Sequence, residues 1–236
     1  MKSISRILLV STLSVLAFSF WATAKNKKVV FLADKGKNTT VHAHESGNAI
    51  LANALEESKL GFDTAQFKGW PTDPKAFDGA DSVVIFCNGG KGHLVMNHLD
   101  QFEKLIDSGV GFVFMHYAVE VPIGRAGVLM REAMGGYFET HWSVNPHWTA
   151  EFKSLPKHPI TRGVKPFTQK DEWYFHMRFQ PDMKGVTPIL SAHPPEETMK
   201  RKDGPHSNNP HVRKSMAAGE IQHIGWAYER PNGKGR

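Results

Sequence analysis

Short apolar runs alternate with polar turns and with segments of helical spacing along the first half of the chain. The runs at 28–33, 82–87 and 111–115 are apolar almost without a break, which is typical of strands buried on both faces of a parallel sheet. A further strand is expected at 62–67. This alternation predicts an α/β fold in which a mostly parallel sheet carries helices on both faces.

Two helices are predicted between these strands. Ser46 is of the residue type that caps a helix N-terminus, and the helix that it would start is expected to run to about Lys59. One face of this helix would hold Ile50, Leu51, Ala54 and Leu55. The second helix is expected to end at Gly109, and its apolar positions are Leu99, Phe102, Leu105 and Ile106.

The pattern changes after Gly135 and Gly136. Residues 137–171 are rich in aromatic residues, histidine and proline. Strands are expected again at 186–192 and 221–228. The loop between them, 193–210, carries four prolines and is predicted to be a surface excursion.

The N-terminus has the organisation of a secretory signal peptide. Two basic residues precede an apolar run at 7–20, and the small residues Ala22 and Ala24 follow it. The run is too short to span a bilayer comfortably. We expect residues 1–24 to be a signal peptide, 25–236 to form one domain, and the protein to be periplasmic or secreted; the alternative is an uncleaved N-terminal anchor.

Composition and charge argue against some classes of function. Removal of the predicted signal takes away two positive charges and no acidic ones, so the net charge falls from +6 to +4. The lysines are scattered, which argues against nucleic-acid binding. Cys87 is the only cysteine, so an internal disulfide is excluded. The 13 histidines suit metal or acid–base chemistry, although dispersed histidines are also ordinary surface residues.

Polar residues follow three of the predicted strands, at the sheet edge where α/β proteins bind ligands. The first group is His42, His44 and Glu45. Alternate residues of a loop can turn toward one point, and imidazoles with a carboxylate suit a divalent cation such as zinc. The alternative is a polar loop whose Glu45 favours the N-terminus of a helix.

His116 and Tyr117 follow the strand at 111–115, at a turn of the kind where α/β enzymes present a nucleophile. An imidazole there can act as acid, base or metal ligand, or can simply be hydrogen-bonded at the strand end. Cys87, with His93 nearby in sequence, is a weaker candidate nucleophile because it ends a buried strand.

Two further segments carry candidate chemistry. Residues 135–148 interleave polar groups with aromatic rings, which suits a sugar, although Trp142 and Trp148 could equally fill the core. In the second segment, 171–176, the aromatic neighbours of Glu172 would raise the pKa of its carboxyl group and fit it for proton transfer; a surface ion pair is the alternative.

Six segments in order make the chain resemble one known family, the ThuA-like (trehalose utilisation) proteins, and among them a secreted bacterial subgroup. The resemblance runs from about Lys28 to the C-terminus. The segments are HAHE at 42–45, DSVVIFCNGGKGH at 81–93, GVGFVFMHYAVE at 109–120, GGYFETHWSVNPHW at 135–148, HPITRGV at 158–164 and DEWYFHMRF at 171–179.

The resemblance implies a flavodoxin-like fold of the class I glutamine amidotransferase type and a role in the catabolism of trehalose or related disaccharides through 3-keto-sugars. In glutamine amidotransferases a cysteine follows the fourth strand, where this chain has His116. Glutamine hydrolysis is therefore not implied. The family usually continues beyond 233–236 with a strand, a Gly-His turn and a helix, so we expect this chain to lack that strand and helix.

The leading hypothesis is a secreted enzyme that acts on a disaccharide or 3-keto-sugar derivative by metal-assisted hydrolysis, isomerisation or lyase chemistry. The alternatives are a non-catalytic sugar-binding module and, less favoured, a Cys87-dependent amidase. The expected partner is a small carbohydrate, with no nucleic acid and no stable membrane span, and a homo-oligomer is left open.

Candidate roles follow from these segments. The predicted catalytic residues are Glu172, His116 and Tyr117. The predicted substrate-binding residues are Asn88, His93, His141, Trp142 and Tyr174. The predicted ligands of a divalent metal are His42, His44 and Glu45, with His141 as a further candidate.

Overall fold

A four-stranded parallel sheet in the order β2-β1-β3-β4 organises the first half of the protein. The computed structural model describes residues 25–35, 42–231 and 233–235, so the predicted signal peptide lies outside the described residues. The four strands are β1 (Lys27–Ala33), β2 (Phe62–Lys68), β3 (Ala80–Phe86) and β4 (Gly111–Phe114). The predicted α/β class is confirmed, because all four predicted strands are present and parallel.

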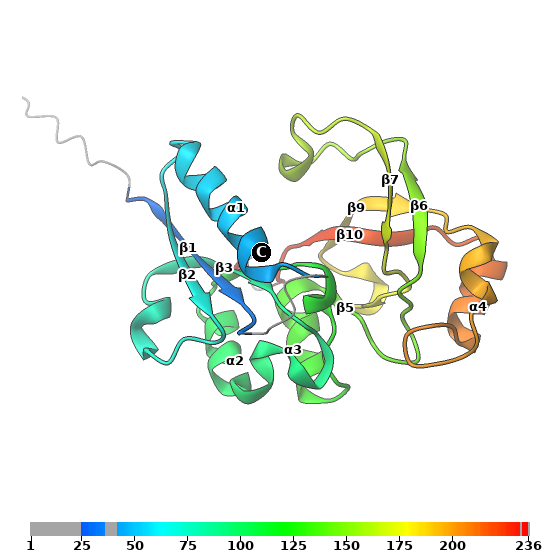
Figure 1. Cartoon of the computed structure of the whole chain (residues 1–236), viewed down its shortest axis with the longest axis horizontal. Coiled ribbons are helices and arrows are strands. Elements are labelled where there is room, and N and C mark those ends of the chain that lie inside the picture. Colours follow the sequence, from blue (N-terminus) through cyan, green and yellow to red (C-terminus); the bar gives the residue numbers. More distant parts are fainter. Residues whose placement is uncertain (1–24, 36–41, 232, 236) are drawn as a thin grey trace, which may run out of the picture.

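Helices cover the two faces of this sheet, with α1 on one side and α2 and α3 on the other (Figure 1). Successive side chains of a strand point to opposite faces. Val29 and Phe31 of β1 therefore pack toward α1, while Val30 and Leu32 join the larger core under the other two helices. The helices are α1 (His44–Glu57), α2 (Leu99–Asp107) and α3 (Arg125–Met134).

The start and the buried face of α1 differ from the prediction. The helix begins at His44, two residues before Ser46, and has no side-chain cap. Its buried positions are His44, Asn48 and Ala52, whereas Ile50 is 70% exposed. The buried stripe thus contains two polar residues, so hydrophobic spacing alone selected the wrong face.

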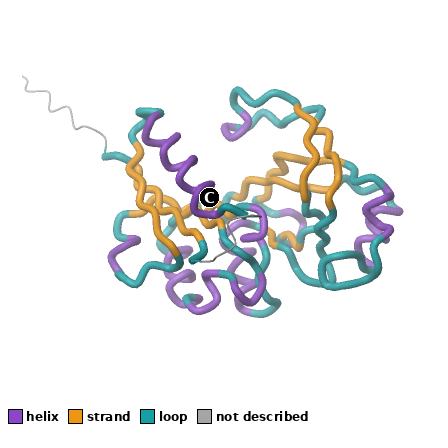
Figure 2. Tube along the Cα trace, viewed as in Figure 1, coloured by secondary structure: helices purple, strands orange, loops and turns teal. Residues whose placement is uncertain are grey.

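The second half is built from antiparallel pairs (Figure 2). Strands β9 and β10 pair with each other, β6 pairs with β7, and the short β5 pairs with β8. A small separate core that includes Trp148 and Phe175 lies between these elements. Their bounds are β5 (Gly136–Tyr137), β6 (His147–Phe152), β7 (Phe167–Glu172), β8 (Arg178–Phe179), β9 (Val186–Ala192), α4 (Pro210–Ala217) and β10 (Gln222–Tyr228).

The loop predicted at 193–210 is only partly a surface excursion. It contains a short 3-10 helix, and Asn208 and Asn209 near its end are buried. Asn209 caps α4, a helix that we did not predict, by accepting a hydrogen bond from the Val212 amide. The Asn209 side chain also donates to the carbonyl oxygen of Trp142 at 3.1 Å, which holds the end of the loop against the rest of the second half.

Strand β4 lies at one edge of the described parallel sheet. Val113, on its α1-facing side, is 49% exposed, so this strand is not buried on both faces as predicted. Over the described ranges, no helix has the length and apolar character needed to cross a membrane.

Candidate active site

Two histidines from different turns face each other at the carboxyl edge of the parallel sheet. His42 lies directly before α1, and His116 follows β4. Their Nε2 atoms are 3.1 Å apart. His116 has a left-handed backbone with φ of 53°, a conformation that non-glycine residues adopt mainly at special sites. The sharp turn predicted after the fourth strand is therefore present, and it directs an imidazole into this edge.

Glu172 brings a carboxylate to these histidines from the second half of the protein. It ends β7, where it pairs in register with His147 of β6. Its Oε2 lies 3.4 Å from Nε2 of His116 and 3.3 Å from the hydroxyl of Tyr174. The Tyr174 ring also packs against the His116 ring, with centroids 4.9 Å apart. Three predicted functional residues, His116, Glu172 and Tyr174, thus meet His42 in one place.

The donor set of His42, His116 and Glu172 fits a divalent cation. One ligand atom from each lies within 4.8 Å of the others. Two zinc bonds of about 2.0–2.1 Å at a tetrahedral angle place their ligand atoms about 3.4 Å apart. The separations of 3.1 Å and 3.4 Å at His116 Nε2 are close to that spacing. Two imidazoles and a carboxylate are also ligands that zinc accepts.

Burial keeps the key imidazole neutral. It lowers the pKa of His116 to about 4, and the neighbouring His42 lowers it further in the same direction. Its nitrogen lone pair is then available at neutral pH, as a metal ligand requires. Burial also raises the pKa of Tyr174 and of Tyr117, and nearby Glu172 adds to both shifts. Both phenols therefore stay protonated and keep a hydroxyl hydrogen to donate.

Neither of the other two predicted metal ligands brings a donor atom to this group. His44 stacks beside His42 with ring centroids 5.7 Å apart, but it is buried against Phe86 and its Nδ1 lies 3.5 Å from Oδ2 of Asp34. Glu45 forms a partly exposed ion pair with Lys68 at 2.6 Å. The helix begins at His44, so consecutive side chains diverge by about 100° and cannot reach one point as a loop's would.

Of the predicted substrate-binding residues, only Tyr174 contacts this group, and the other four are placed elsewhere. His93 is 2% exposed, and both of its ring nitrogens are engaged by the backbone of Val95 and Ala118. A residue so enclosed cannot touch a substrate. The backbone amide of Asn88 is bound to Asp34, and its side chain borders a different cavity, beside Trp70.

His141 and Trp142 contact residues other than His42, His116 and Glu172. His141 is exposed, with its backbone amide bonded to Pro205. Trp142 is stacked between His176 and His211, each 4.6 Å away, and under the guanidinium of Arg178. The indole of Trp142 is thus packed against three other side chains of the protein.

Cys87 is poorly placed to act as a nucleophile. Its side chain is fully buried in the larger core, and burial raises the pKa of its thiol to about 12. A thiol of that pKa is protonated at neutral pH, whereas the thiolate is the reactive form. The backbone around it is also tight, since a side chain on Gly89 would collide with the carbonyl oxygen of Tyr117.

Sequence reasoning missed a buried acid with its histidine partner and the two residues that are hydrogen-bonded in series to Glu172. Glu120 is 3% exposed, and its two oxygens lie 2.9 and 3.0 Å from Nε2 of His206. Asn145 donates from Nδ2 to Oε1 of Glu172 at 3.0 Å, and Arg201 donates to Oδ1 of Asn145 at 3.2 Å. These contacts join positions 56 and 86 residues apart, so no local spacing signals them.

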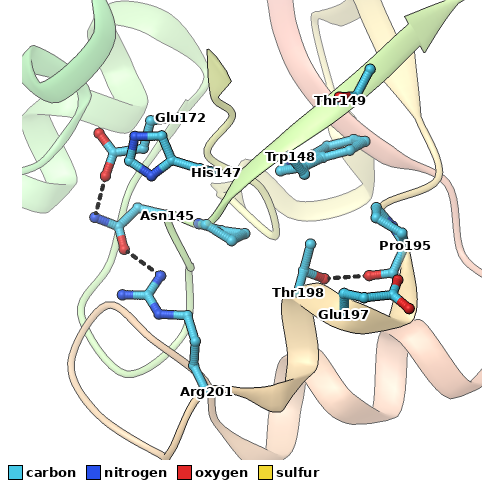
Figure 3. Close-up of a pocket in the computed structure, with 10 residues that line it drawn as sticks. Asn145, His147, Trp148, Thr149, Glu172, Pro195, Glu197, Thr198 and Arg201 are labelled. Atoms are coloured by element: carbon cyan, nitrogen blue, oxygen red, sulfur yellow. Dashed lines mark hydrogen bonds between the residues drawn. The ribbon is translucent and has the colours of Figure 1, made fainter. Parts of the chain in front are cut away.

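A cavity of about 530 Å³ borders Glu172 and could admit a small polar ligand. Figure 3 shows the hydrogen-bonded series of Arg201, Asn145 and Glu172 along one side of it, with the Trp148 ring and Thr198 on another. The polar groups of this cavity can hydrogen-bond a hydroxyl-rich ligand, but the Trp148 ring is only 4% exposed and belongs to the small core, so the alternative that it fills the core holds for this residue. The cavity is lined by Asn145, Pro146, His147, Trp148, Thr149, Glu172, Pro195, Glu197, Thr198 and Arg201.

Comparison with known proteins gave one family and two informative structures. The family model for ThuA, described as trehalose utilisation, matches residues 28–235. A ThuA-like protein from Bacteroides uniformis aligns with a TM-score of 0.56 at 16% identity, covering 90% of this chain and 87% of its own. One from Parabacteroides merdae aligns with a TM-score of 0.50 at 18% identity, covering 78% and 74%. At these identities the structures establish the fold alone. No curated protein matched the sequence.

Proposed function

Since this chain belongs to the ThuA family of trehalose utilisation, we propose that it is an extracytoplasmic enzyme acting on a disaccharide or 3-keto-sugar derivative by metal-assisted acid–base chemistry. The observation that carries this proposal is the meeting of His42, His116 and Glu172 from three separate segments. The extracytoplasmic location rests only on the sequence of residues 1–24.

Each residue of the cluster has a separate role in this proposal. His42 and His116 would hold the cation through their Nε2 atoms, and a bound divalent metal would polarise a carbonyl or hydroxyl oxygen of the sugar. Glu172 has Oε1 engaged by Asn145, so Oε2 either completes the ligand set or accepts the proton from the substrate. The hydroxyls of Tyr174 and Tyr117 remain donors, because their raised pKa values prevent them from acting as bases.

Zinc binding tests the site without knowledge of the substrate. We would titrate metal-free protein with zinc against a chromogenic chelator, and repeat this with His42→Ala and His116→Ala. The matched control is His193→Ala, since His193 is exposed and outside the cluster. We expect one zinc site that both cluster variants abolish and the control keeps. Equal binding by all four proteins would show that these histidines hold no metal.

Glu172→Gln separates the two roles of the carboxylate. A ligand role predicts that zinc affinity falls, whereas a proton-transfer role predicts that affinity is kept and turnover is lost. Turnover would be followed by product analysis on trehalose, 3-keto-trehalose and a methyl 3-keto-glucoside. Binding of one of these sugars without any turnover by the wild type would instead favour the non-catalytic sugar-binding module.

A further inference from the structure

Arg201, Asn145 and Glu172 form a hydrogen-bonded series whose direction is fixed by chemistry (Figure 3). Arginine has only donors, and an ionised carboxylate has only acceptors. The Asn145 amide between them must therefore turn Oδ1 to Arg201 and Nδ2 to Glu172. The reverse orientation would face donor with donor and acceptor with acceptor.

Asn145 is also held at its backbone. Its amide donates to the carbonyl oxygen of His206 at 3.0 Å, and the ring of His206 is anchored on the buried Glu120. The loop that carries Arg201 and His206 is thus hydrogen-bonded to both the main chain and the side chain of Asn145. A residue fixed at both points has little freedom to release Glu172.

We propose that Asn145 and Arg201 are positioning residues that present Oε2 of Glu172 to His116. This inference rests on the proposed function, because it assigns a purpose to the orientation of Glu172. With Oε1 occupied by Asn145 at 3.0 Å, the other oxygen, Oε2, accepts from the Tyr174 hydroxyl and lies 3.4 Å from His116 Nε2. Partners of this kind around a metal site fix the ligand geometry, and their loss typically weakens metal binding 10–100-fold.

The competing explanation is that the series only braces the loop against the hairpin of β6 and β7. A brace would affect folding stability and leave the carboxylate of Glu172 unchanged. A positioning role would change Glu172 while the exposed side chain of Arg201 contributes little to stability. The two explanations therefore differ in what Arg201→Met alters.

The test uses the full chain with Arg201→Met, Asn145→Leu and the control Arg213→Met. Arg213 lies near the same loop and pairs with Asp203 on the surface. We expect zinc affinity to fall about 10-fold in Arg201→Met and about 100-fold in Asn145→Leu, which removes both hydrogen bonds without adding a charge, within the range for such partners. Arg201→Lys, which can still donate one hydrogen bond, should recover part of the loss. The control should match the wild type.

A second readout does not depend on metal. In metal-free protein labelled with ¹³C at the glutamate carboxyl carbon, the Glu172 resonance is assigned by its absence in Glu172→Gln. We expect this resonance to move in Arg201→Met and Asn145→Leu and to stay in place in Arg213→Met. If wild-type protein binds no zinc, the proposed function fails, while a moved resonance still supports the positioning role. An unmoved resonance, or zinc affinities equal within about twofold, would overturn it.

Discussion

The two halves of this protein contribute to the candidate site in different ways. In residues 27–134 a parallel sheet and three helices enclose a large core, and the turns at its edge carry His42 and His116. In 136–228 the strands form three separate pairs around a small core, and Glu172 lies at the end of one hairpin. The imidazoles thus rest on a packed scaffold, whereas the carboxylate depends on hydrogen bonds to a loop.

Buried polar contacts join the two halves. Arg230, near the end of the chain, donates to the carbonyl oxygens of Ile106 at 3.1 Å and Val110 at 2.8 Å in the first half. Glu120 of the first half holds His206 of the second. Buried polar groups are costly unless they are paired, so these contacts determine how the halves sit together. Packing thus supports the two histidines, whereas polar pairing supports Glu172.

The largest effect is expected from the core of the first half. Phe102 of α2 is fully buried, and its ring meets that of Phe112 with centroids 5.1 Å apart. We expect Phe102→Ala to lower the free energy of unfolding by about 3–5 kcal/mol, through lost burial and the cavity left behind. Urea unfolding measures this. Ile50→Ala, at an exposed position, should change it by less than about 0.5 kcal/mol, and similar losses in both variants would contradict the packing described.

The next effect is a pH dependence in the same half. Burial lowers the pKa of His93 to about 4, while an unfolded chain takes up this proton near pH 6.5. Between these values the unfolded state binds more protons, so stability falls as the pH is lowered through that window. The full loss is about 3 kcal/mol.

Urea unfolding at about pH 7 and about pH 4.5 would show the contribution of His93. We expect the difference between the two pH values to be smaller in His93→Gln, which has no titrating ring, whatever its absolute stability. A variant with the same pH dependence as the wild type would mean that His93 is not enclosed as described.

A smaller effect is expected where polar pairing joins the halves. Glu120→Gln removes the charge that faces His206 and should cost about 1.5–3 kcal/mol, the range for hydrogen bonds to charged groups. A local effect is also expected, because the Asn145 amide donates to the carbonyl oxygen of His206. When His206 is no longer held by Glu120, this amide should exchange its hydrogen with solvent faster. Hydrogen exchange followed by NMR measures it. Glu103→Gln, at an exposed pair with Arg125, should leave this amide protected.

The smallest effect on stability is expected at the edge strand. Val113 and Val164 are each 49% exposed, but of these two only Val113 lies on β4, the strand at the edge of the described parallel sheet. An open apolar edge favours association between copies. We expect the wild type to self-associate in sedimentation velocity and Val113→Lys to reduce this, with a stability change below about 0.5 kcal/mol. Val164→Lys is the control, and a monomeric wild type would refute the expectation.

The sequence by itself determined the α/β class, the strands of the parallel sheet and the sharp turn that presents His116. These depend on contiguous apolar positions and on neighbouring residues, so a local pattern records them. Glu172 and Tyr174 were also recognisable, because an acid among aromatic residues is a local signal.

Only the tertiary structure decided which histidine joins His116 and what orients Glu172. His42 and His44 are equivalent in sequence, but the helix begins at His44 and turns that side chain into the protein. Arg201 and His206 lie in a proline-rich loop that the sequence presents as a surface excursion. Their partners, Asn145 and Glu120, are 56 and 86 residues away, and contacts over such distances arise from packing of whole elements, which no local spacing encodes.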